Sequence, residues 1–390
     1  MTLPASLACH RVSAEHVDSV RLGRVVWSPA KSLWFLGMVA GAIAGLFHFS
    51  WAAFFLFLAT TGCVLLFGHS LGSHRRLIHG SYDCPKWLEY AFVYCGVQVG
   101  LAGPLGLMRQ HELRDYAQRL PDCHDYLRHG RAFWIDAWWQ LNCELRLARP
   151  PAIRIEPRVA GDRFYDFLER TWMAQQLPWA ALFYLWGGWG FVLWGTCARV
   201  TAGVFGHWLI GYFAHNHGPM HYRVDAAAVQ GHNVRFTSLI TMGESWHNNH
   251  HAFPGSARLG LYPGEWDPGW WVLVLLRRAG LVWNLRLPQH LPARPEVLAL
   301  EHAVKGITTN KPTIEWPASV MPAWAMRVLL GHRIELREDP TVMRLTFHDD
   351  GITAQGLPGL CLALERRSPR VASCLRPFAN VAERMRIPVA

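Results

Sequence analysis

Four apolar stretches divide the chain. Residues 32–50 and 51–68 lie back to back and contain no Asp, Glu, Lys or Arg. Residues 177–195 are also uncharged, and residues 199–214 complete a second pair that contains a single charge, Arg199. A helix needs about 20 residues to cross roughly 30 Å of hydrocarbon. The pattern therefore predicts four membrane-spanning helices in two hairpins. The last stretch is the weakest of the four, because a run of about 14 residues also suits a buried core helix.

Positive charge is distributed unevenly around these stretches. Residues 69–176, between the two pairs, hold 14 Lys and Arg residues, whereas Arg199 is the one basic residue of the predicted outer turns. Cytoplasmic loops are enriched in Lys and Arg, so the middle segment and both termini are expected in the cytoplasm. Residues 87–107 are apolar but contain Glu89, and we expect them to be partly inserted or to lie along the membrane interface. Four basic residues precede the first stretch: Arg11, Arg21, Arg24 and Lys31.

The predicted fold class is an all-α integral membrane protein with four transmembrane helices in two hairpins and a cytoplasmic helical cap. Near the C-terminus, residues 342–347 and 351–354 are short runs between Asp, Pro and Gly, which predicts strands. Residues 360–385 could form one or two basic amphipathic helices, giving a small mixed α/β region. The predicted division is a cytoplasmic segment 1–31, a membrane domain 32–290 that carries the spans, and a cytoplasmic region 300–390.

Composition excludes several other classes. The formal net charge of +10 invites a nucleic-acid interpretation, but the Arg residues flank apolar spans and mix with Asp and Glu, so no basic stripe forms. The nine cysteines form no Cys-x-x-Cys pair, which argues against a zinc ribbon or a redox dithiol. Residues 1–31 lack the apolar core of a cleavable signal.

We expect a multi-pass protein of a bacterial inner membrane.

Three closely spaced histidines suggest a metal site. His247, His250 and His251 stand at positions i, i+3 and i+4, which share one face of a helix. Neutral imidazole binds iron, zinc, copper and nickel, so the triplet indicates a metal without choosing one. A histidine-rich surface turn is the alternative.

More histidines gather where the apolar stretches end. His69, His74 and His79 contain the His-x4-His spacing twice, and only one of the two can be the motif. Ionisable residues at span ends mark function more often than packing, although a single histidine there is more often a capping or interfacial residue. The second group surrounds the end of the fourth stretch: His207, His215, His217 and His221.

These motifs resemble the histidine boxes of the membrane fatty-acid desaturases, in particular the acyl-chain delta-9 group. The first box is matched by residues 72–82, followed by Pro-Lys-Trp-Leu-Glu-Tyr at 85–90, and this alignment selects His74 and His79. The third box is matched by residues 243–253. The resemblance covers roughly residues 32–290 and implies an iron-dependent membrane enzyme.

The second box departs from the family. The family has His-x-x-His-His, preceded by Gly-Pro, where this chain has His111-Glu-Leu-Arg114-Asp115. Asp115 lies at i+4 from His111 and could replace one imidazole with an oxygen ligand. Arg114 stays protonated, so it would disfavour a second metal or pair with Asp115. The family also has an asparagine where this chain has Gly211, four residues before His215.

The resemblance implies a set of site residues. Glu112, Asp115 and Glu244 are candidates to orient the ligand imidazoles, and His124 or His129 could fill the gap in the second box. Residues on the support or substrate side are Glu244, Asp122, His124 and Trp246. No catalytic residue beyond the ligands is expected. The implied metal ligands are His74, His79, His111, His215, His247, His250, His251 and Asp115.

The implied reaction is oxygen-dependent desaturation of a fatty acyl chain, with two Fe2+ ions as cofactor and O2 as co-substrate. The substrate would be an acyl-lipid or acyl-CoA met in contact with membrane lipids. The chain has no haem, flavin or nucleotide motif and no cysteine cluster, so an external electron donor such as a ferredoxin is expected, and residues 300–390 could dock it or pack on the cap. The alternatives are a related hydroxylase or oxygenase and a degenerate scaffold without catalysis, which Arg114 favours.

Overall fold

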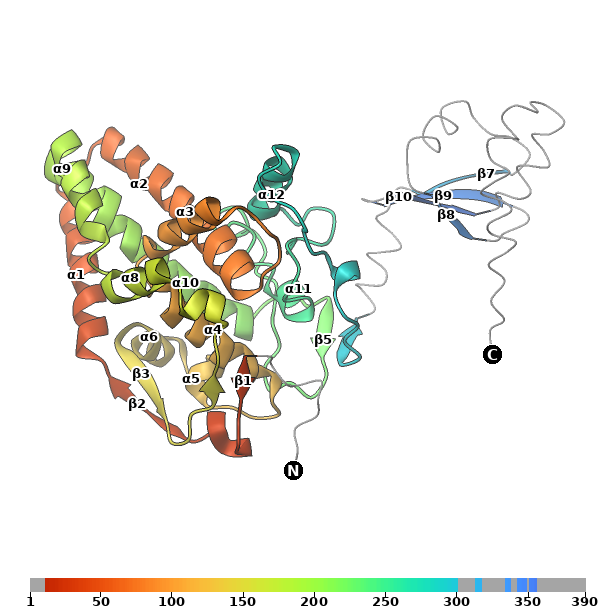
Figure 1. The fold of residues 1–390 in the computed structure, drawn as a ribbon, viewed down its shortest axis with the longest axis horizontal. Coiled ribbons are helices and arrows are strands. Elements are labelled where there is room, and N and C mark those ends of the chain that lie inside the picture. The colour runs from red at the N-terminus through yellow and green to blue at the C-terminus, as the bar shows by residue number, and fades with distance from the viewer. Residues whose placement is uncertain (1–10, 301–312, 318–333, 338–341, 349–350, 356–390) are drawn as a thin grey trace. The chain divides into compact units, whose positions relative to one another are not determined.

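The computed structural model describes residues 11–300 and the backbone of four later strands. The chain divides into two compact units, residues 1–301 and 302–390. The described part of the first unit is mostly helical, as predicted (Figure 1). In the second unit the four strands form one sheet in the order β7-β9-β10-β8, with β8 and β10 parallel. The strands predicted within 342–347 and 351–354 are therefore confirmed, and the helices predicted at 360–385 lie outside the described residues. The strands are β7 Thr313–Pro317, β8 Ile334–Arg337, β9 Val342–His348 and β10 Gly351–Gln355.

The first apolar pair forms a helical hairpin. Helix α1, Pro29–Leu46, begins with a proline in its first turn, and α2, Trp51–Cys63, is capped by Ser50, whose side chain accepts from the backbone N–H of Ala53. Helix α2 continues into η3, Val64–Ile78, a wider π-helical segment. By length and composition, α1 and the α2–η3 run are apolar enough to cross a membrane, and only 17% of each apolar window is buried. Their apolar side chains therefore face outward, unlike those of a core helix in a soluble protein.

The second apolar pair turns earlier than its sequence predicts. Helix α9, Gln176–Val192, is broken at Gly187 and Gly188, and Gly188 has the left-handed φ of 67° that glycine adopts readily. From there the chain runs helically through η4, Leu193–Ala198, and α10, Arg199–Asn216. The boundary predicted at about residues 195–199 is therefore wrong. Arg199 stays inside the helix because its guanidinium donates to the carbonyl oxygens of Gly195 and Gln98, each at 2.7 Å.

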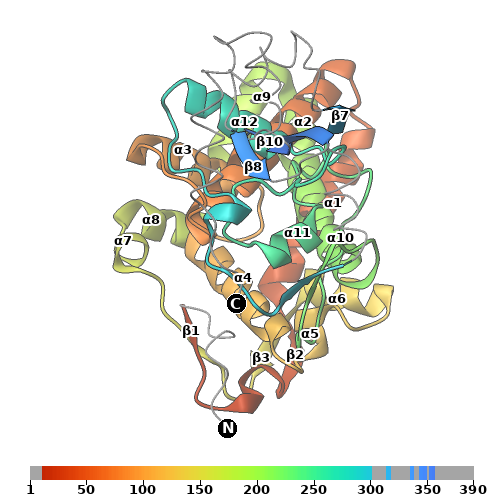
Figure 2. The same ribbon diagram turned by 90° about the vertical axis from the view of Figure 1, so that its right-hand side faces the viewer.

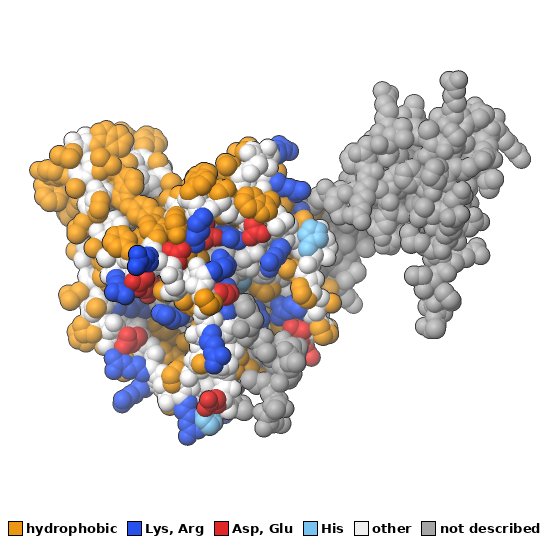
Figure 3. Space-filling view, in the orientation of Figure 1, with side chains coloured by type: hydrophobic (Ala, Val, Ile, Leu, Met, Phe, Trp, Pro, Cys, Tyr) orange, Lys and Arg blue, Asp and Glu red, His pale blue; other side chains and the backbone are white. Residues whose placement is uncertain are grey.

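The surface separates into an apolar and a charged part. In Figure 3, hydrophobic side chains cover the end of the first unit formed by α2 and α9, and Lys, Arg, Asp and Glu side chains gather toward the opposite end. Among the exposed apolar side chains, Phe47 is 85% and Leu185 is 83% exposed. Such a continuous apolar surface is suited to hydrocarbon rather than water.

Close packing of α3 on η3 fixes the end of η3 that carries two site histidines. Helix α3 spans Lys86–Val97 and buries Phe92 and Val93 against η3. A Cβ at Gly68 or Gly72 would come within 2.6 Å of the α3 backbone, so only glycine allows this approach. Residues 87–107, which were predicted to be partly inserted or to lie along the membrane interface, thus form a packed helix, a turn at Gly100 and the start of α4.

The remaining elements of the first unit are small sheets and helices. Three two-stranded antiparallel sheets pair β1 with β4, β2 with β3, and β5 with β6. Helices α4, α10 and α11 approach one another in both views of the first unit (Figures 1 and 2). The bounds are β1 Val12–Ser13, η2 Val17–Val20, β2 Gly23–Trp27, α4 Pro104–Arg119, α5 Asp125–Arg128, α6 Phe133–Asn142, β3 Cys143–Leu147, β4 Ala152–Ile153, α7 Pro157–Ala160, α8 Arg163–Thr171, β5 Tyr222–Val224, α11 His247–Ala252, α12 Pro268–Arg278, η5 Pro288–His290 and β6 Val297–Ala299.

Candidate metal centre

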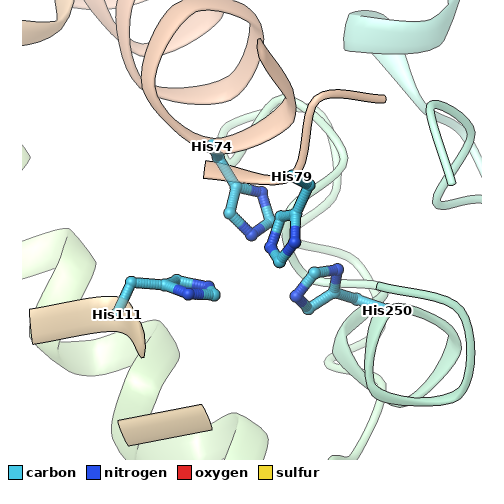
Figure 4. Close-up of side chains that lie close together, drawn as sticks. All are labelled: His74, His79, His111 and His250. Atoms are coloured by element: carbon cyan, nitrogen blue, oxygen red, sulfur yellow. The ribbon is translucent and has the colours of Figure 1, made fainter. Parts of the chain in front are cut away.

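Four histidines from three parts of the sequence meet at one point. His74 lies near the end of η3, His79 follows η3 directly, His111 lies on α4 and His250 on α11. One possible ligand atom from each lies within 4.8 Å of the others. Figure 4 shows the four rings turned toward a common centre. We call this cluster site A.

The nitrogens of site A fit a metal ion. Nε2 of His79, Nδ1 of His111 and Nδ1 of His250 are buried and have no hydrogen-bond partner within the part of the chain that the structure describes. Leaving three buried acceptors or donors unpaired is costly unless a ligand satisfies them. Burial, and next the neighbouring His74, lower the pKa of His111 to about 3. The imidazole is therefore neutral at neutral pH, which is the form that binds metal.

A second cluster, site B, contains His215 at the end of α10 with His247 and His251 on α11. The Nε2 atom of His247 lies 3.2 Å from Nε2 of His215 and 3.0 Å from Nε2 of His251. Nδ1 of His215 donates to the carbonyl oxygen of Gly211 at 2.7 Å, so in the neutral ring Nε2 carries the lone pair. Three ring nitrogens thus converge as potential donors to one cation. Burial lowers the pKa of His251 to about 4, although the Asp115 carboxylate acts in the opposite direction.

A buried carboxylate supports site A. Oε2 of Glu244 lies 2.6 Å from Nδ1 of His74, and its Oε1 accepts from the Ser70 hydroxyl at 2.6 Å. Burial alone would raise the pKa of Glu244, but His74 and Arg75 together hold it below its ordinary value. An ionised carboxylate on Nδ1 fixes the ring and leaves Nε2 of His74 for a metal, the arrangement by which proteins orient histidine ligands.

The N-terminal segment also reaches site A. Nη1 of Arg11 donates at 2.6 Å both to the carbonyl oxygen of Ile78 and to Oε1 of Glu112. Ile78 precedes His79, and Glu112 follows His111. Arg11, which is 5% exposed, therefore ties together the two segments that present these histidines. Glu112, a predicted orienting residue, acts in the structure through this ion pair.

The two altered residues of the second box point away from each other. Oδ2 of Asp115 accepts from Nη2 of Arg119 at 2.6 Å, and Asp115 belongs to neither cluster. Arg114 instead contacts Nε2 of His129 and donates to Oε1 of Gln140 at 2.9 Å. The predicted alternative of an Arg114–Asp115 pair is therefore wrong.

Arg114 belongs to a buried relay of polar groups. Nδ1 of His129 lies 2.9 Å from Oδ2 of Asp136, which also accepts from the indole N–H of Trp208 at 2.8 Å. Burial, and next Arg114, lower the pKa of His129 to about 4. A Cβ at Gly211 would lie 3.0 Å from Nε2 of His129, so the relay occupies the space next to this glycine. His129 has a left-handed φ of 55°, which costs a non-glycine residue energy that these contacts offset.

Comparisons with known proteins agree with this geometry. The sequence model of the family described as "Fatty acid desaturase" matches residues 49–261, which contain all seven histidines of sites A and B. The chain belongs to the fatty acid desaturase family. It is 34% identical over 259 residues to an sn-1 stearoyl-lipid 9-desaturase of Anabaena variabilis, a match that covers 66% of this chain and 93% of the relative. It is 32% identical over 250 residues to an acyl-CoA 5-desaturase of Anemone leveillei, covering 64% and 76% of the two chains.

The other predicted residues of this desaturase lie outside both clusters. Nδ1 of His124 accepts from the backbone N–H of Tyr126 and so caps α5. Asp122 pairs with Arg21 at 2.9 Å on the surface. Trp246 is 6% exposed and donates through its indole to the carbonyl oxygen of Trp266.

One polar residue at the desaturase site was not predicted from the sequence. Oε1 of Gln118 lies 3.0 Å from Nε2 of His215. Gln118 stands seven residues after His111, and positions i and i+7 share one face of a helix. Extending the helical face of His111 by two turns along α4, past the second box, identifies Gln118.

Proposed function

We propose that this protein is an oxygen-dependent fatty acyl desaturase whose two iron ions are held by sites A and B. The ligands would be His74, His79, His111 and His250 at site A, and His215, His247 and His251 at site B. The observation that carries the proposal is the convergence of these seven imidazoles from four separate segments of the chain. Asp115, also a predicted ligand, is not included, because it belongs to neither cluster and accepts from Arg119.

Iron would supply the redox chemistry by which O2, two electrons and two protons remove two hydrogens from an acyl chain and yield two waters. The protein positions that chemistry. Glu244 holds the ring of His74, Gly211 holds the ring of His215, and burial keeps His111 and His251 unprotonated for binding. The apolar surface of the helical hairpins would keep the enzyme beside its lipid substrate.

The membrane arrangement is proposed as four spans in two hairpins, with both termini in the cytoplasm of a bacterial inner membrane. The two long apolar helices, the uncharged α9 and the basic residues between the pairs support it. The substrate is proposed to be an acyl group on a membrane lipid or on CoA, because relatives of both kinds match the chain. Electrons would come from a separate donor such as a ferredoxin.

The related hydroxylase and the inactive scaffold are not favoured. The relatives described above are desaturases, and each cluster keeps at least three imidazoles despite the altered second box. Arg114, the residue that favours an inactive scaffold, is engaged by His129 and Gln140.

The test combines metal and product analysis. Protein purified in mild detergent from iron-supplemented cells should contain about two irons per chain, and the His251→Ala variant should contain fewer. Lipids from expressing cells should gain a double bond only when O2 is present, and this gain should be absent with His251→Ala. A new hydroxyl would indicate the hydroxylase, and one iron or none in the parent protein would contradict the two-iron mechanism.

A further inference from the structure

We propose that the side-chain amide oxygen of Gln118 is the fourth donor of site B. The inference rests on the proposed two-iron function and extends it to a residue outside the histidine boxes. Site A has four imidazoles, whereas site B has three. An amide oxygen is a suitable additional donor for a divalent ion such as Fe2+.

Gln118 is built into the protein interior beside site B. It is 2% exposed and lies near the C-terminal end of α4, the helix that also carries His111. Its Oε1 atom is 3.0 Å from Nε2 of His215. Two donors that are each about 2.1 Å from one ion and about 90° apart lie about 3.0 Å from each other. The separations of 3.0 and 3.2 Å around His247 are of the same size.

The orientation of the amide is fixed by its other contact. Nε2 of Gln118 donates to the carbonyl oxygen of Leu127 at 2.8 Å. A carbonyl oxygen can only accept, so the amide nitrogen must be on that side and Oε1 must face His215. No exchange of the amide oxygen and nitrogen would preserve the bond to Leu127.

The facing nitrogen is also an acceptor. Nδ1 of His215 lies 2.7 Å from the carbonyl oxygen of Gly211, the shorter of the two ring contacts, and we assign the hydrogen of the neutral ring to it. Nε2 of His215 and Oε1 of Gln118 therefore face each other with lone pairs and no hydrogen between them. Such a contact is repulsive unless both atoms bind a cation. A shared metal ion satisfies both atoms at once.

Neighbouring candidates are engaged elsewhere. One oxygen of Asp115 accepts from Arg119, and Nε2 of His129 faces Arg114. Gln118 differs from Asp115 in bringing no charge. Site B would then combine three imidazoles with one neutral oxygen, and we expect it to hold its ion less tightly than site A.

The experiment measures metal retention in the full-length protein. Parent, Gln118→Ala and Asp115→Asn proteins are purified in detergent, loaded with Fe2+ without oxygen, and titrated with a chelator. We expect the parent to hold two ions. Gln118→Ala should release one of them at a chelator concentration at least roughly tenfold lower than the parent requires. Asp115→Asn should release its ions as the parent does. Gln140→Ala, which removes a glutamine from Arg114 and not from site B, is the matched control.

A second variant keeps the test decisive if Gln118→Ala does not fold. Gln118→Glu retains an oxygen donor and should hold two ions. Loaded with Co2+, it should show a changed visible absorption spectrum, because a carboxylate replaces an amide on one ion. An unchanged spectrum, or parent-like retention in Gln118→Ala, would overturn the role of Gln118. Fewer than two ions in the parent would instead contradict the two-iron function.

Discussion

Sites A and B lie side by side yet differ in how they are built. Site A has four imidazoles, and its neighbourhood includes an ionised Glu244 and the Arg11 bridge between Ile78 and Glu112. Site B has three imidazoles, and its His215 stacks on His129, which contacts Arg114 of the altered second box. The difference teaches that the altered second box still leaves two clusters, one of four imidazoles and one of three.

The largest effect should come from removing a ligand of the site with four imidazoles. His111→Ala removes one of four imidazoles from site A, so we expect loss of at least one iron and of all detectable desaturation. Loss of a residue that orients a ligand typically lowers metal affinity or activity by about 10- to 100-fold, and loss of the ligand itself should lower them further. Iron content and cellular lipid composition measure both effects. His124→Ala is the control, because His124 caps α5 and belongs to neither cluster. Equal losses in the two variants would count against site A.

A smaller effect should come from the residue that orients His74. Glu244→Gln removes the negative charge beside Nδ1 while keeping the size of the side chain. We expect roughly 10- to 100-fold weaker retention of one ion, with the ion of site B retained. Chelator titration monitored by Co2+ absorption would distinguish the two ions. Release of both ions together would show that the sites do not behave as separate units.

The relay around Arg114 predicts a coupling between two substituted positions. Gly211→Asn restores the residue of the family but places a side chain against His129 and Arg114, because even a Cβ would lie 3.0 Å from Nε2 of His129. We expect a loss of about 1–3 kcal/mol in stability from this overpacking. Adding Arg114→Ala should recover part of that loss. Thermal unfolding of the single and double variants gives the coupling, and strictly additive losses would contradict it.

The last prediction concerns the pH dependence of stability in the metal-free protein. The pKa values of His111, His129 and His251 lie at about 3, 4 and 4 in the folded protein, below the ordinary value of 6.5. The unfolded chain therefore binds more protons between about pH 6.5 and 4, and the metal-free protein should lose stability as the pH falls through this range. Each histidine contributes a slope of about 1.4 kcal/mol per pH unit. Unfolding temperatures at pH 7.5 and 5.5 test this, and His129→Gln should show a weaker dependence.

The sequence predicted the parts of the molecule that depend on local spacing. The i, i+3, i+4 triplet of His247, His250 and His251 lies on one helix, although its members serve two different clusters. The length of the two uncharged apolar runs likewise predicted the first hairpin. The resemblance to the desaturases supplied the assignment of His74 and His79, which spacing alone left open.

The parts that could not be predicted depend on distant partners. Arg199 marked the outer turn in the sequence, but Gln98 and Gly195 satisfy its charge inside a helix and the turn falls at Gly187–Gly188. The position of the Arg114 side chain depends on its contact with His129, and the left-handed backbone of His129 places that ring next to Gly211. Neither arrangement has a signature in the local sequence.

The bridge made by Arg11 links the start of the chain to the metal centre. Replacing this arginine with alanine would remove the bridge between Ile78 and Glu112 while leaving every histidine and both helical hairpins in place. We expect the variant to hold an ion at site A less tightly than the parent. The start of the chain, far from the histidine boxes in sequence, therefore helps to set the geometry of the metal centre.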